Sequence, residues 1–529
     1  MSADPTQPPE SLDFASGAVA AEALLDAGRL AEAIVLLAAL AEARPENPWV
    51  WASLGRCHEG LGDGAAELEA CLKAIELDPS LGRVRLRAAM LQDDFGQFDA
   101  AAANLRIVCE SHPGNAKAAL RLARVYGALG QGELEAGAWA RMLALQPDNV
   151  EAHRRLGELH WQAGRSLEAA PHLKRVLDAM PDKPKLWPRY AHCLEEAGDL
   201  KGAEAAWARA LEVDPDDVEA AERLAKLRLF GDGGSPGRSP VAKFRLAVLG
   251  NCQAYAMARC MRALNPDIEV ASIGWGEVRS SEKARRVVQS LSAVDAILAQ
   301  PVNVGWLGEF RPKALVKIGP TCAFYPPIHF TGFHPDGLLA NGEGLVSLIG
   351  DWHSTLIVAG FRMGLPPART QELFNAYIFG VLGYFEEDAK AVEFLRRKGR
   401  QLDWDLDPEL EAWRRQGVFV HTANHPRIEV MMSLARRACE RLGFPANPDA
   451  ATPPDPFDRL GDWPLYPEIG KRLGLAGDLT FVSPFARGRA FDLEGAIDWY
   501  YAVYAKAPPE ALVLPRADWA MKLLRAEGI

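Results

Sequence analysis

The sequence lacks any uninterrupted apolar run of the length, about 18 residues, that a membrane-spanning helix needs. Its N-terminus, MSADPTQPPESLDF, has no basic segment followed by an apolar stretch, so we do not expect a secretory signal peptide. Cysteine is also scarce: the 529 residues contain 8, with no CxxC pair, which argues against a disulfide framework and against a cysteine zinc site. We therefore expect a cytoplasmic protein without a transmembrane segment.

Positive charge is deficient in the first part of the chain. The net charge is −11, and residues 1–243, with 27 basic and 37 acidic side chains, hold almost all of the excess. From Phe244 onward, 32 basic side chains nearly balance 33 acidic ones. Nucleic acids and anionic lipids both require clustered positive charge, so we expect neither as a partner.

A repeat of 34 residues runs through this acidic part. Proline and glycine each recur six times with that spacing, at Pro45, Pro79, Pro113, Pro147, Pro181 and Pro215 and at Gly28, Gly62, Gly96, Gly130, Gly164 and Gly198. The glycine is expected in the tight turn between two helices and the proline between successive units. A small residue recurs where the two helices touch, and a second such position holds alanine in four repeats but Glu67 and Glu135 in the other two.

This period and pattern resemble the tetratricopeptide (TPR) repeat, a helix–turn–helix unit. The resemblance implies an all-α solenoid over residues 14–230, with six repeats and a capping helix over 218–229, preceded by a disordered N-terminus (1–13). Its concave face is expected to bind a protein partner.

A segment rich in Gly, Ser and Pro, residues 231–243, predicts a flexible linker. Beyond it, apolar runs at 246–249, 268–273, 294–298 and 315–318 alternate with helical patterns, which indicates a small, mainly parallel sheet. After about residue 345 the pattern becomes helical, with expected helices at 345–360, 369–387, 389–400, 408–415, 427–442 and 493–504. Residues 244–529 are therefore expected to form an α/β domain with a helix-rich second half.

Cys252 is the first candidate for chemistry. It lies in Gly250-Asn251-Cys252-Gln253, between the end of a predicted strand and the start of a helix. The free N–H groups and the helix dipole at that point favour a thiolate or a bound anion. A small buried cysteine that merely fills space is the alternative.

Histidines are the second candidate. Five lie in short segments of this domain flanked by proline, glycine or aromatic residues, namely His329, His334, His353, His421 and His425. Each can serve as a general base or as a hydrogen-bonded structural residue. His329, His334 and Asp336 could be metal ligands, but no HExxH motif accompanies them and we predict no metal. Arg427, near a predicted helix start, is the best candidate for binding a phosphate.

Five segments, in the order VLGNCQ, AVDAILAQPV, PPIHFTGFHPD, DWHS and HTANHP, resemble the WcbI-type family of polysaccharide biosynthesis enzymes over roughly residues 244–443. The resemblance implies a coenzyme A-binding acetyltransferase that acts on a sugar hydroxyl of a capsular polysaccharide. We accordingly expect Cys252 to carry the acetyl group from acetyl-CoA, His334 or His425 to act as the base, and Asn251 and Gln253 to stabilise the oxyanion. The expected cofactor-binding set is Asn251, Gln253, His329, Asp336, His353, Ser354, His421 and Arg427.

Two other classes stay open. In one, the TPR array is a scaffold and the C-terminal domain is not catalytic. In the other, the domain is a sulfotransferase or glycosyltransferase. The loop after the first strand, GNCQAYA, has no basic residue before Arg259, which disfavours a sulfotransferase, and the DxD sequence at 403–405 is read as a charge cluster at a helix start.

Overall fold

A computed structural model describes residues 13–215, 217–230, 243–278, 280–302, 305–340, 344–349, 351–483 and 488–529. The expected disordered N-terminus, apart from Asp13, and nearly all of the expected linker lie outside these residues. The chain divides into two compact units, Met1–Pro215 and Asp216–Ile529. Within the described residues, every helix is too short or too polar to reach across a bilayer.

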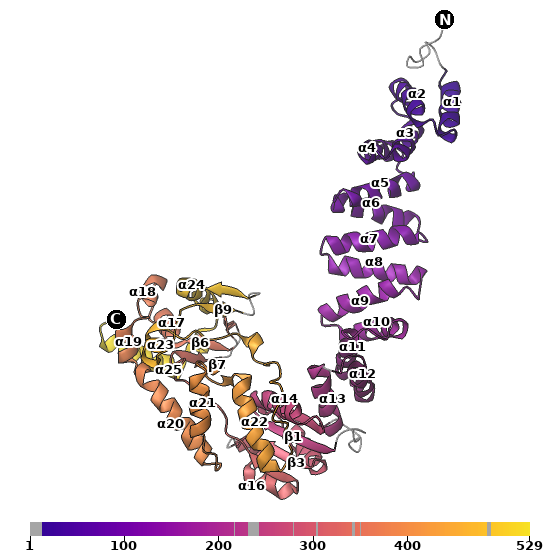
Figure 1. Cartoon of the computed structure of the whole chain (residues 1–529). Coiled ribbons are helices and arrows are strands. Elements are labelled where there is room, and N and C mark those ends of the chain that lie inside the picture. Colours follow the sequence, from indigo (N-terminus) through magenta and orange to yellow (C-terminus); the bar gives the residue numbers. More distant parts are fainter. Residues whose placement is uncertain are drawn as a thin grey trace. The chain divides into compact units, whose positions relative to one another are not determined.

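The first unit is an array of helix pairs (Figure 1). Its described helices are α1 (Phe14–Asp26), α2 (Leu30–Ala43), α3 (Pro48–Leu61), α4 (Gly64–Leu77), α5 (Gly82–Asp94), α6 (Phe98–Ser111), α7 (Ala116–Ala128), α8 (Gly132–Leu145), α9 (Val150–Gln162), α10 (Ser166–Ala179), α11 (Leu186–Glu196) and α12 (Leu200–Val213). Each helix packs mainly on its neighbours in sequence, as in a solenoid. The predicted α-solenoid is confirmed.

The six periodic glycines all have the backbone geometry that the sequence predicts. Each lies in the turn within a helix pair, with φ between 68° and 77°, a region that residues with a Cβ rarely adopt. The recurring small residues are buried at the helix contacts, as shown by Ala21, Ala89 and Ala123, which have no exposed surface.

The two glutamates that replace alanine are both buried and ion-paired. Glu67 binds Arg87, with an Oε2–Nη2 distance of 2.8 Å. Glu135 binds Arg155 at 2.6 Å and accepts a hydrogen bond of 3.0 Å from Trp139 Nε1. A buried carboxylate is tolerated only with such partners. Since both arginines lie 20 residues after their glutamates, the same solution is used in two alternate repeats.

The second unit begins with α13 (Val218–Phe230), the helix that we expected to cap the repeats. Its Ala225 and Leu229 pack on a four-stranded parallel sheet of order β2-β1-β3-β4. The strands are β1 (Phe244–Gly250), β2 (Ile268–Gly274), β3 (Ala296–Ala299) and β4 (Thr321–Phe324).

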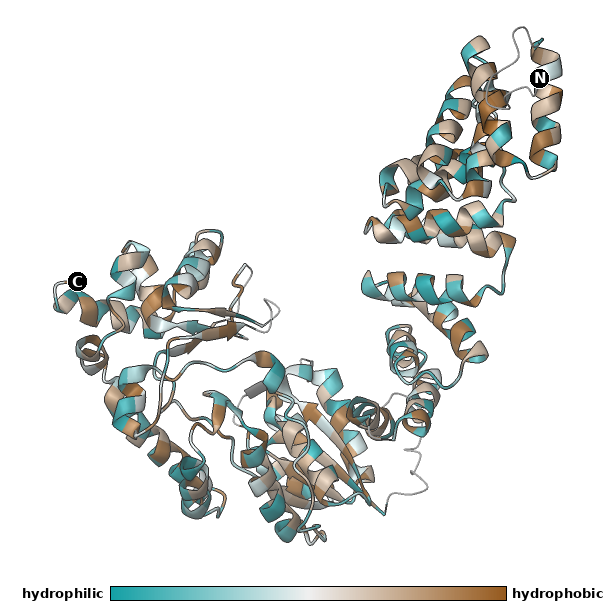
Figure 2. Cartoon of the chain, turned by 45° about the horizontal axis from the view of Figure 1, so that its top comes forward, coloured by the Kyte–Doolittle hydropathy of each residue, from teal (hydrophilic) through white to brown (hydrophobic). Residues whose placement is uncertain are grey.

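Helices cover both faces of this sheet, so side chains of β1 alternate between two apolar cores. Leu246 and Val248 pack on the side of α14 (Gln253–Leu264) and α22 (Ile428–Leu442). Ala247 and Leu249 pack on the side of α13 and α15 (Ser281–Ser290). Figure 2 shows the apolar residues on the strands between these helices.

The fourth strand was predicted wrongly at 315–318. Pro312 instead opens a short helix, α16 (Pro312–Leu315), and Val316–Ile318 continues as a 3-10 turn that ends at Gly319, with φ 117°. Three apolar residues in four resemble a short buried strand in sequence, but in the structure Leu315 is fully buried and Val316 is exposed. The real strand β4 follows directly, after Pro320.

The helix-rich second half is confirmed, with corrections. Its helices are α17 (Thr355–Arg362), α18 (Pro367–Gln371), α19 (Ala376–Val381), α20 (Glu387–Arg400), α21 (Asp407–Arg415), α22, α23 (Pro467–Leu473), α24 (Leu493–Tyr504) and α25 (Pro515–Ala526). Three antiparallel hairpins were missed, formed by β5 (Gly337–Leu339) with β6 (Trp352–Ser354), β7 (Val420–Thr422) with β8 (His425–Pro426), and β9 (Phe481–Ser483) with β10 (Arg489–Phe491). Strands of two or three residues are too short to show a period in sequence.

Candidate active site

Cys252 lies at the topological switch point of the sheet. β1 has β2 on one side and β3 on the other, so the loops that follow β1 and β3 diverge at the carboxyl edge. Open α/β sheets bind their ligands at this point. Cys252 directly precedes α14, so its predicted position between a strand and a helix is confirmed.

The turn around Cys252 is held by hydrogen bonds with Gln300, the first residue after β3. The Asn251 N–H donates to Gln300 Oε1 at 2.9 Å, and the Gln253 N–H donates to Asn251 Oδ1 at 2.9 Å. A Cβ at Gly250 would lie 2.8 Å from Gln300 Oε1 and from the Tyr325 hydroxyl, so this approach requires glycine. The N–H groups expected to stabilise an oxyanion are already engaged within the turn.

The Gln253 side chain connects this turn to two distant loops. It is fully buried, and Nε2 donates to the carbonyls of Ile328 (2.6 Å) and Asn424 (2.9 Å). Its Oε1 accepts from Ile328 N (3.0 Å) and Gln300 Nε2 (2.9 Å). All four positions of the amide are used, so Gln253 positions the loops and has no atom left for the cofactor that we expected it to bind.

Cys252 opens into a pocket of about 430 Å³. The pocket is lined by Glu219, Glu222, Arg223, Lys226, Cys252, Tyr255, Arg259, Ser272, Glu277, Pro456, Phe457 and Arg459. The first four of these residues belong to α13. The helix expected to cap the repeats therefore forms one wall of the pocket that holds the thiol.

Ion pairs join α13 to the rest of the wall. Arg259 of α14 binds Glu222 at 2.7 Å, and Lys226 binds Glu277, which also accepts a hydrogen bond from Tyr255. Burial raises the pKa of Glu277, but the hydrogen bonds from Lys226 and Tyr255 outweigh burial and bring the pKa below its usual value. The carboxylate is therefore ionised. This wall is thus fixed by charge pairs.

The Cys252 thiol is protonated at neutral pH. Burial raises its pKa to about 11, although the N–H groups of Cys252 and Gln253 lower it. We expected the helix start to favour a thiolate, but desolvation outweighs the dipole here. Attack by this sulfur would require a base.

Among the expected bases, His425 is near this pocket. Its ring stacks on Phe457, which lines the pocket, with 4.8 Å between ring centroids. Its Nδ1 lies 2.9 Å from Thr422 Oγ1. Burial, followed by the charge on His421, lowers the pKa of His425 to about 4, so the ring is neutral and can accept a proton.

Tyr325 is a residue of this site that the sequence did not reveal. It directly follows β4, it is fully buried, and its hydroxyl has no hydrogen-bond partner among the described residues. Burial raises its pKa well above the usual value, and nearby Cys252 adds to this rise. Nothing in the sequence pointed to it, because the strand β4 that precedes it was not predicted.

His334 lies apart from the Cys252 pocket, in a fully enclosed position. Burial lowers its pKa to about 4, although the backbone carbonyls of Val420 and Pro464 raise it. It is not among the residues that line the Cys252 pocket. The structure brings His425 to that pocket but not His334.

Asp336, His353 and Ser354 support the β5–β6 hairpin. The Asp336 carboxylate accepts hydrogen bonds from the hydroxyls of Tyr384 and Tyr466, both at 2.8 Å, and is completely buried. His353 Nδ1 lies 2.9 Å from the Tyr504 hydroxyl, and Ser354 caps α17. These contacts enclose all three side chains, whereas we expected them to bind the cofactor.

His421 and Arg427 belong to one charged network. His421 lies between Asp462 (2.5 Å from Nδ1) and Asp455 (2.9 Å from Nε2). Burial lowers its pKa, but the two carboxylates raise it to about 9, so it is protonated at neutral pH. Arg427 binds Asp462 at 3.0 Å and the Val418 carbonyl at 2.9 Å.

This network faces a different pocket, of about 710 Å³, lined in part by Arg427 and Asp455. Among the described residues, His421, Asp455 and Asp458 are the one group of three side chains spaced closely enough to hold a metal ion. His421 Nε2 already has Asp455 as an ion-pair partner. Arg427, expected to bind a phosphate, is tied to Asp462.

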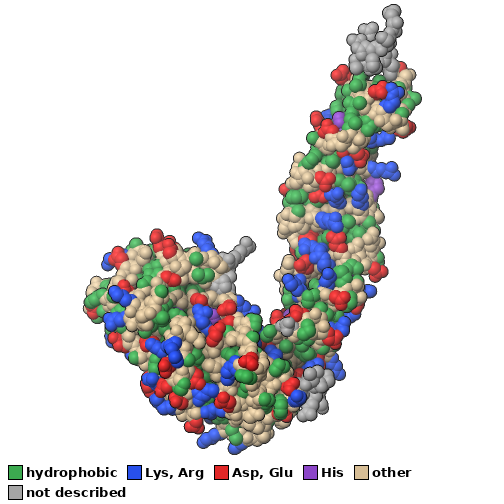
Figure 3. Space-filling model, in the orientation of Figure 1, with side chains coloured by type: hydrophobic (Ala, Val, Ile, Leu, Met, Phe, Trp, Pro, Cys, Tyr) green, Lys and Arg blue, Asp and Glu red, His purple; other side chains and the backbone are tan. Residues whose placement is uncertain are grey.

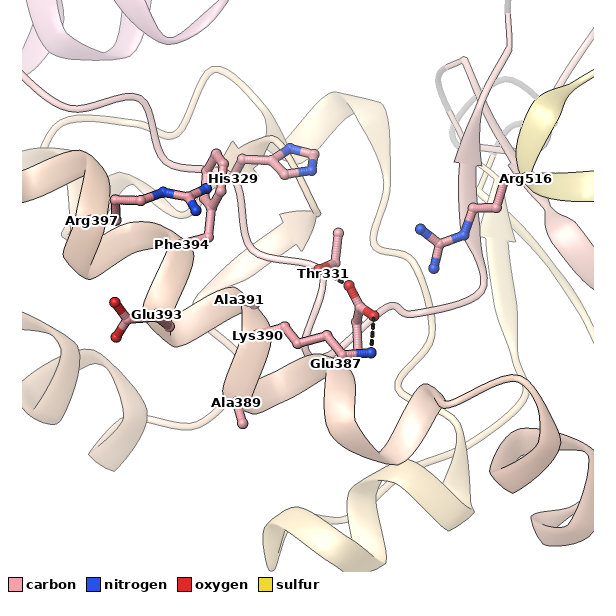
Figure 4. A pocket seen from close by; sticks show the side chains of 10 residues that line it. All are labelled: His329, Thr331, Glu387, Ala389, Lys390, Ala391, Glu393, Phe394, Arg397 and Arg516. Carbon is pink, nitrogen blue, oxygen red and sulfur yellow. Dashed lines mark hydrogen bonds and ion pairs between the residues drawn. The ribbon is translucent and has the colours of Figure 1, made fainter. Parts of the chain in front are cut away.

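His329 lines a third pocket, of about 720 Å³, shown in Figure 4. The side chain is exposed, and its ring meets Phe394 edge-on, with 6.0 Å between centroids. Partial desolvation by the surrounding pocket walls, followed by the charge of Arg516, lowers its pKa. The eight side chains expected to bind one cofactor are thus spread over separate places in this unit.

Family models match both parts of the chain. The model of the polysaccharide biosynthesis enzyme WcbI matches residues 245–447. Two tetratricopeptide repeat models match residues 19–81, 86–144 and 127–184, and residues 160–227. Tetratricopeptide repeats are therefore found in the N-terminal part of the chain and a WcbI domain in the C-terminal part.

The solved structures to which this chain is similar include one of WcbI, described as a novel polysaccharide biosynthesis enzyme, the native protein without a disulfide bond between coenzyme A and a cysteine. The two sequences are 20% identical. The match covers 53% of this chain and 98% of the WcbI chain, with a TM-score of 0.43. MamA from Desulfovibrio magneticus RS-1 shares 22% identity and covers 31% of this chain and 93% of that chain, with a TM-score of 0.27. YrrB, described as a TPR protein with an unusual peptide-binding site, shares 17% sequence identity. The match covers 35% of this chain and 95% of the YrrB chain, with a TM-score of 0.28. No curated protein sequence matches the chain.

Proposed function

We propose that the second unit transfers an acetyl or other acyl group from a coenzyme A thioester to a hydroxyl of a sugar or polysaccharide. The reaction would take place in the cytoplasm, and the TPR array would bind a protein partner. The observation that carries this proposal is the thiol of Cys252, which lines a pocket at the switch point of a domain matched by the WcbI model.

In the covalent version, Cys252 carries the acyl group. A base, for which His425 is the candidate, takes the thiol proton while the sulfur attacks the thioester carbonyl, and coenzyme A leaves as the thiol after taking up a proton. The sugar hydroxyl then attacks the acyl-cysteine, releasing Cys252 and an ester. The first half-reaction exchanges one thioester for another and is nearly isoenergetic, and the second converts a thioester into the more stable oxygen ester, so neither is thermodynamically uphill.

A direct version has one observation in its favour. The pKa of Cys252 is raised to about 11 and that of His425 is lowered to about 4, so transfer of the thiol proton to this histidine is uphill in the ligand-free protein. In the direct version, Cys252 lines the thioester pocket, and the base activates the sugar hydroxyl instead.

The wall of the Cys252 pocket offers groups suited to coenzyme A. Arg459 is exposed where the pocket meets solvent and suits a phosphate, while the Phe457 ring offers an apolar surface to the pantetheine arm. Because α13 supplies four lining residues, we place the boundary of the active unit before Val218. A fragment that begins at Phe244 would lack this wall.

The test uses the full chain with acetyl-CoA and a panel of sugars. We measure release of free coenzyme A and the mass of the intact protein after exposure to acetyl-CoA alone. The covalent version predicts one added acetyl group and, for Cys252→Ala, a loss of turnover of about 100-fold or more. Cys260→Ala is the matched control, since Cys260 lies on α14, the helix that Cys252 precedes, but is buried in the core.

The outcomes separate the versions. Unacetylated protein with near-normal turnover in Cys252→Ala would remove the covalent step and leave direct transfer. A chain that neither binds nor consumes acetyl-CoA under any condition would overturn the proposed function.

A further inference from the structure

The His329 pocket lies at the same edge of the sheet as the Cys252 pocket. His329 and Thr331 follow β4, as Cys252 follows β1, and parallel strands place their carboxyl ends along one edge. Its other walls come from α20, which supplies Glu387, Lys390, Phe394 and Arg397, and from Arg516 at the start of α25. Gln253 hydrogen-bonds to both backbone groups of Ile328, so the residue after Cys252 holds the residue before His329.

The charges that line this pocket leave an excess of cations. Glu393 is neutralised by Arg400, at 2.5 Å, and Glu387 lies 3.8 Å from Lys390 while it accepts a hydrogen bond from Thr331. Arg397 and Arg516 have no carboxylate partner within the parts of the chain that the structure describes. Figure 3 shows that basic and acidic side chains are intermixed over the face of the molecule that it draws.

Arg516 is positioned to receive an anion. One of its terminal nitrogens donates to the Pro335 carbonyl, which fixes the side chain, while its Nε is buried without a hydrogen-bond partner among the described residues. Figure 4 shows its guanidinium directed into the pocket, toward Thr331 and Glu387, with Arg397 beside Phe394 and His329 on the opposite side. A buried unpaired N–H is costly, and an oxyanion would satisfy it.

Between the two arginines lie groups that bind hydroxyls. The Thr331 hydroxyl, the Glu387 carboxylate and the Lys390 ammonium meet at the centre of the pocket, and the pocket volume of about 720 Å³ exceeds what one small ion needs. A ligand that fits both kinds of group carries several hydroxyls and one oxyanion, as an acidic sugar does.

We propose that this pocket is a binding site for an anionic sugar, one that bears a carboxylate or a phosphate, with Arg516 and Arg397 as its oxyanion-binding residues. This inference rests on the proposed function in one respect, since it takes the bound sugar to be the acyl acceptor. The binding itself is independent of acyl transfer.

The experiment titrates the full chain with glucuronate, glucose 6-phosphate and glucose and measures binding by calorimetry and by saturation-transfer NMR. We expect one or both anionic sugars to bind and glucose to bind about tenfold more weakly or not at all. Glucuronate alone would identify a carboxylate ligand, and glucose 6-phosphate alone a phosphate ligand.

Substitutions at both arginines test the residues. Arg516→Gln and Arg397→Gln should each weaken binding of the anionic sugar about tenfold, whereas Arg516→Lys should retain part of it. Arg396→Gln is the control, because Arg396 is on the same helix but pairs with Asp407 outside the pocket. Having two variants on different helices keeps the test decisive if one of them fails to fold.

Equal binding of glucose and the anionic sugars, or arginine variants that bind like Arg396→Gln, would overturn the inference. Cys252→Ala should bind the anionic sugar normally. If that variant binds sugar while the native chain transfers no acyl group, the proposed function fails and the sugar site stands.

Discussion

The two units bury polar groups in different ways. In the repeat array, each buried carboxylate is paired within its own pair of neighbouring repeats, as Glu67 is with Arg87. In the second unit, buried polar side chains join loops that are far apart in sequence, as Gln253 joins Ile328 and Asn424. The array therefore spreads its stability over similar local contacts, whereas the second unit concentrates it in a few connecting residues. Substitutions should have local effects in the first case and extended effects in the second.

The largest effect is expected from Gln253→Leu. It removes four hydrogen bonds and leaves the buried Ile328 N–H and carbonyl, and the partly buried Asn424 carbonyl, without this partner, which should cost about 4 kcal/mol of folding free energy. Hydrogen exchange followed by mass spectrometry should show faster exchange at residues 325–330 and 420–426, with the repeats unchanged. Gln289→Leu, on the exposed face of α15, is the control. If Gln253→Leu exchanged as slowly as the native chain in these segments, Gln253 would not be a residue on which the stability of the second unit depends.

The next effect depends on pH. The folded-state pKa of His421, about 9, lies above its ordinary value of 6.5, so its contribution to stability is complete below pH 6.5 and is lost as the pH rises toward 9. This contribution amounts to roughly 3 kcal/mol. Burial raises the pKa values of Asp455 and Asp462, but the hydrogen bonds and the positive charges around them together lower both below the usual value, and the stability that this adds is lost as the pH falls below about 3.8.

Urea titrations of the native chain and of His421→Gln between pH 6 and 9.5 test this dependence. The native second unit should lose stability across that range, and His421→Gln should show a flatter profile. His112→Gln, which replaces an exposed histidine of the repeats, should follow the native curve. Parallel profiles for the native chain and His421→Gln would show that His421 is not charged in the folded protein.

The same difference explains what the sequence could predict. The repeats were predictable because proline, glycine and small residues each report on one local contact and recur every 34 residues. Cys252 was placed correctly because strand, turn and helix adjoin in sequence. The partners of Gln253 lie 75 and 171 positions away, and nothing local indicates them.

The histidines show most clearly what could not be predicted from the sequence. His425 and His334 appeared equivalent in sequence, since both lie in short loops beside proline. Only the fold shows that the His425 ring stacks on Phe457, which lines the Cys252 pocket, whereas His334 is buried away from that pocket. The wall of the Cys252 pocket supplied by α13 was missed because that helix continues the helical pattern of the repeats.

A smaller effect is expected from Arg87→Met in the array. It leaves the Glu67 carboxylate buried without its main partner, at a cost of about 2 kcal/mol, reduced because Arg87 is itself about one-third exposed. The double variant Glu67→Ala and Arg87→Met should recover most of this loss, because alanine occupies the same position in four other repeats. Urea unfolding monitored by exchange in residues 48–111 measures both, with Arg106→Met as an exposed control. Failure of the double variant to recover would mean that the ion pair does more than satisfy a buried charge.

The smallest effect is expected from Gly62→Ala. Gly62 has φ 75° and open space where a Cβ would lie, so the change should cost only the strain of a left-handed backbone, about 1 kcal/mol, and exchange should quicken in α3 and α4 alone. Gly114→Ala is the matched control, since Gly114 also has open space but no positive φ, and this change should leave stability equal or slightly higher. The comparison isolates backbone conformation from packing. Loss of protection that spread from α3 and α4 through all twelve helices would show that the array unfolds as one cooperative body, and the contrast between a locally stabilised array and a network-stabilised domain would then not hold.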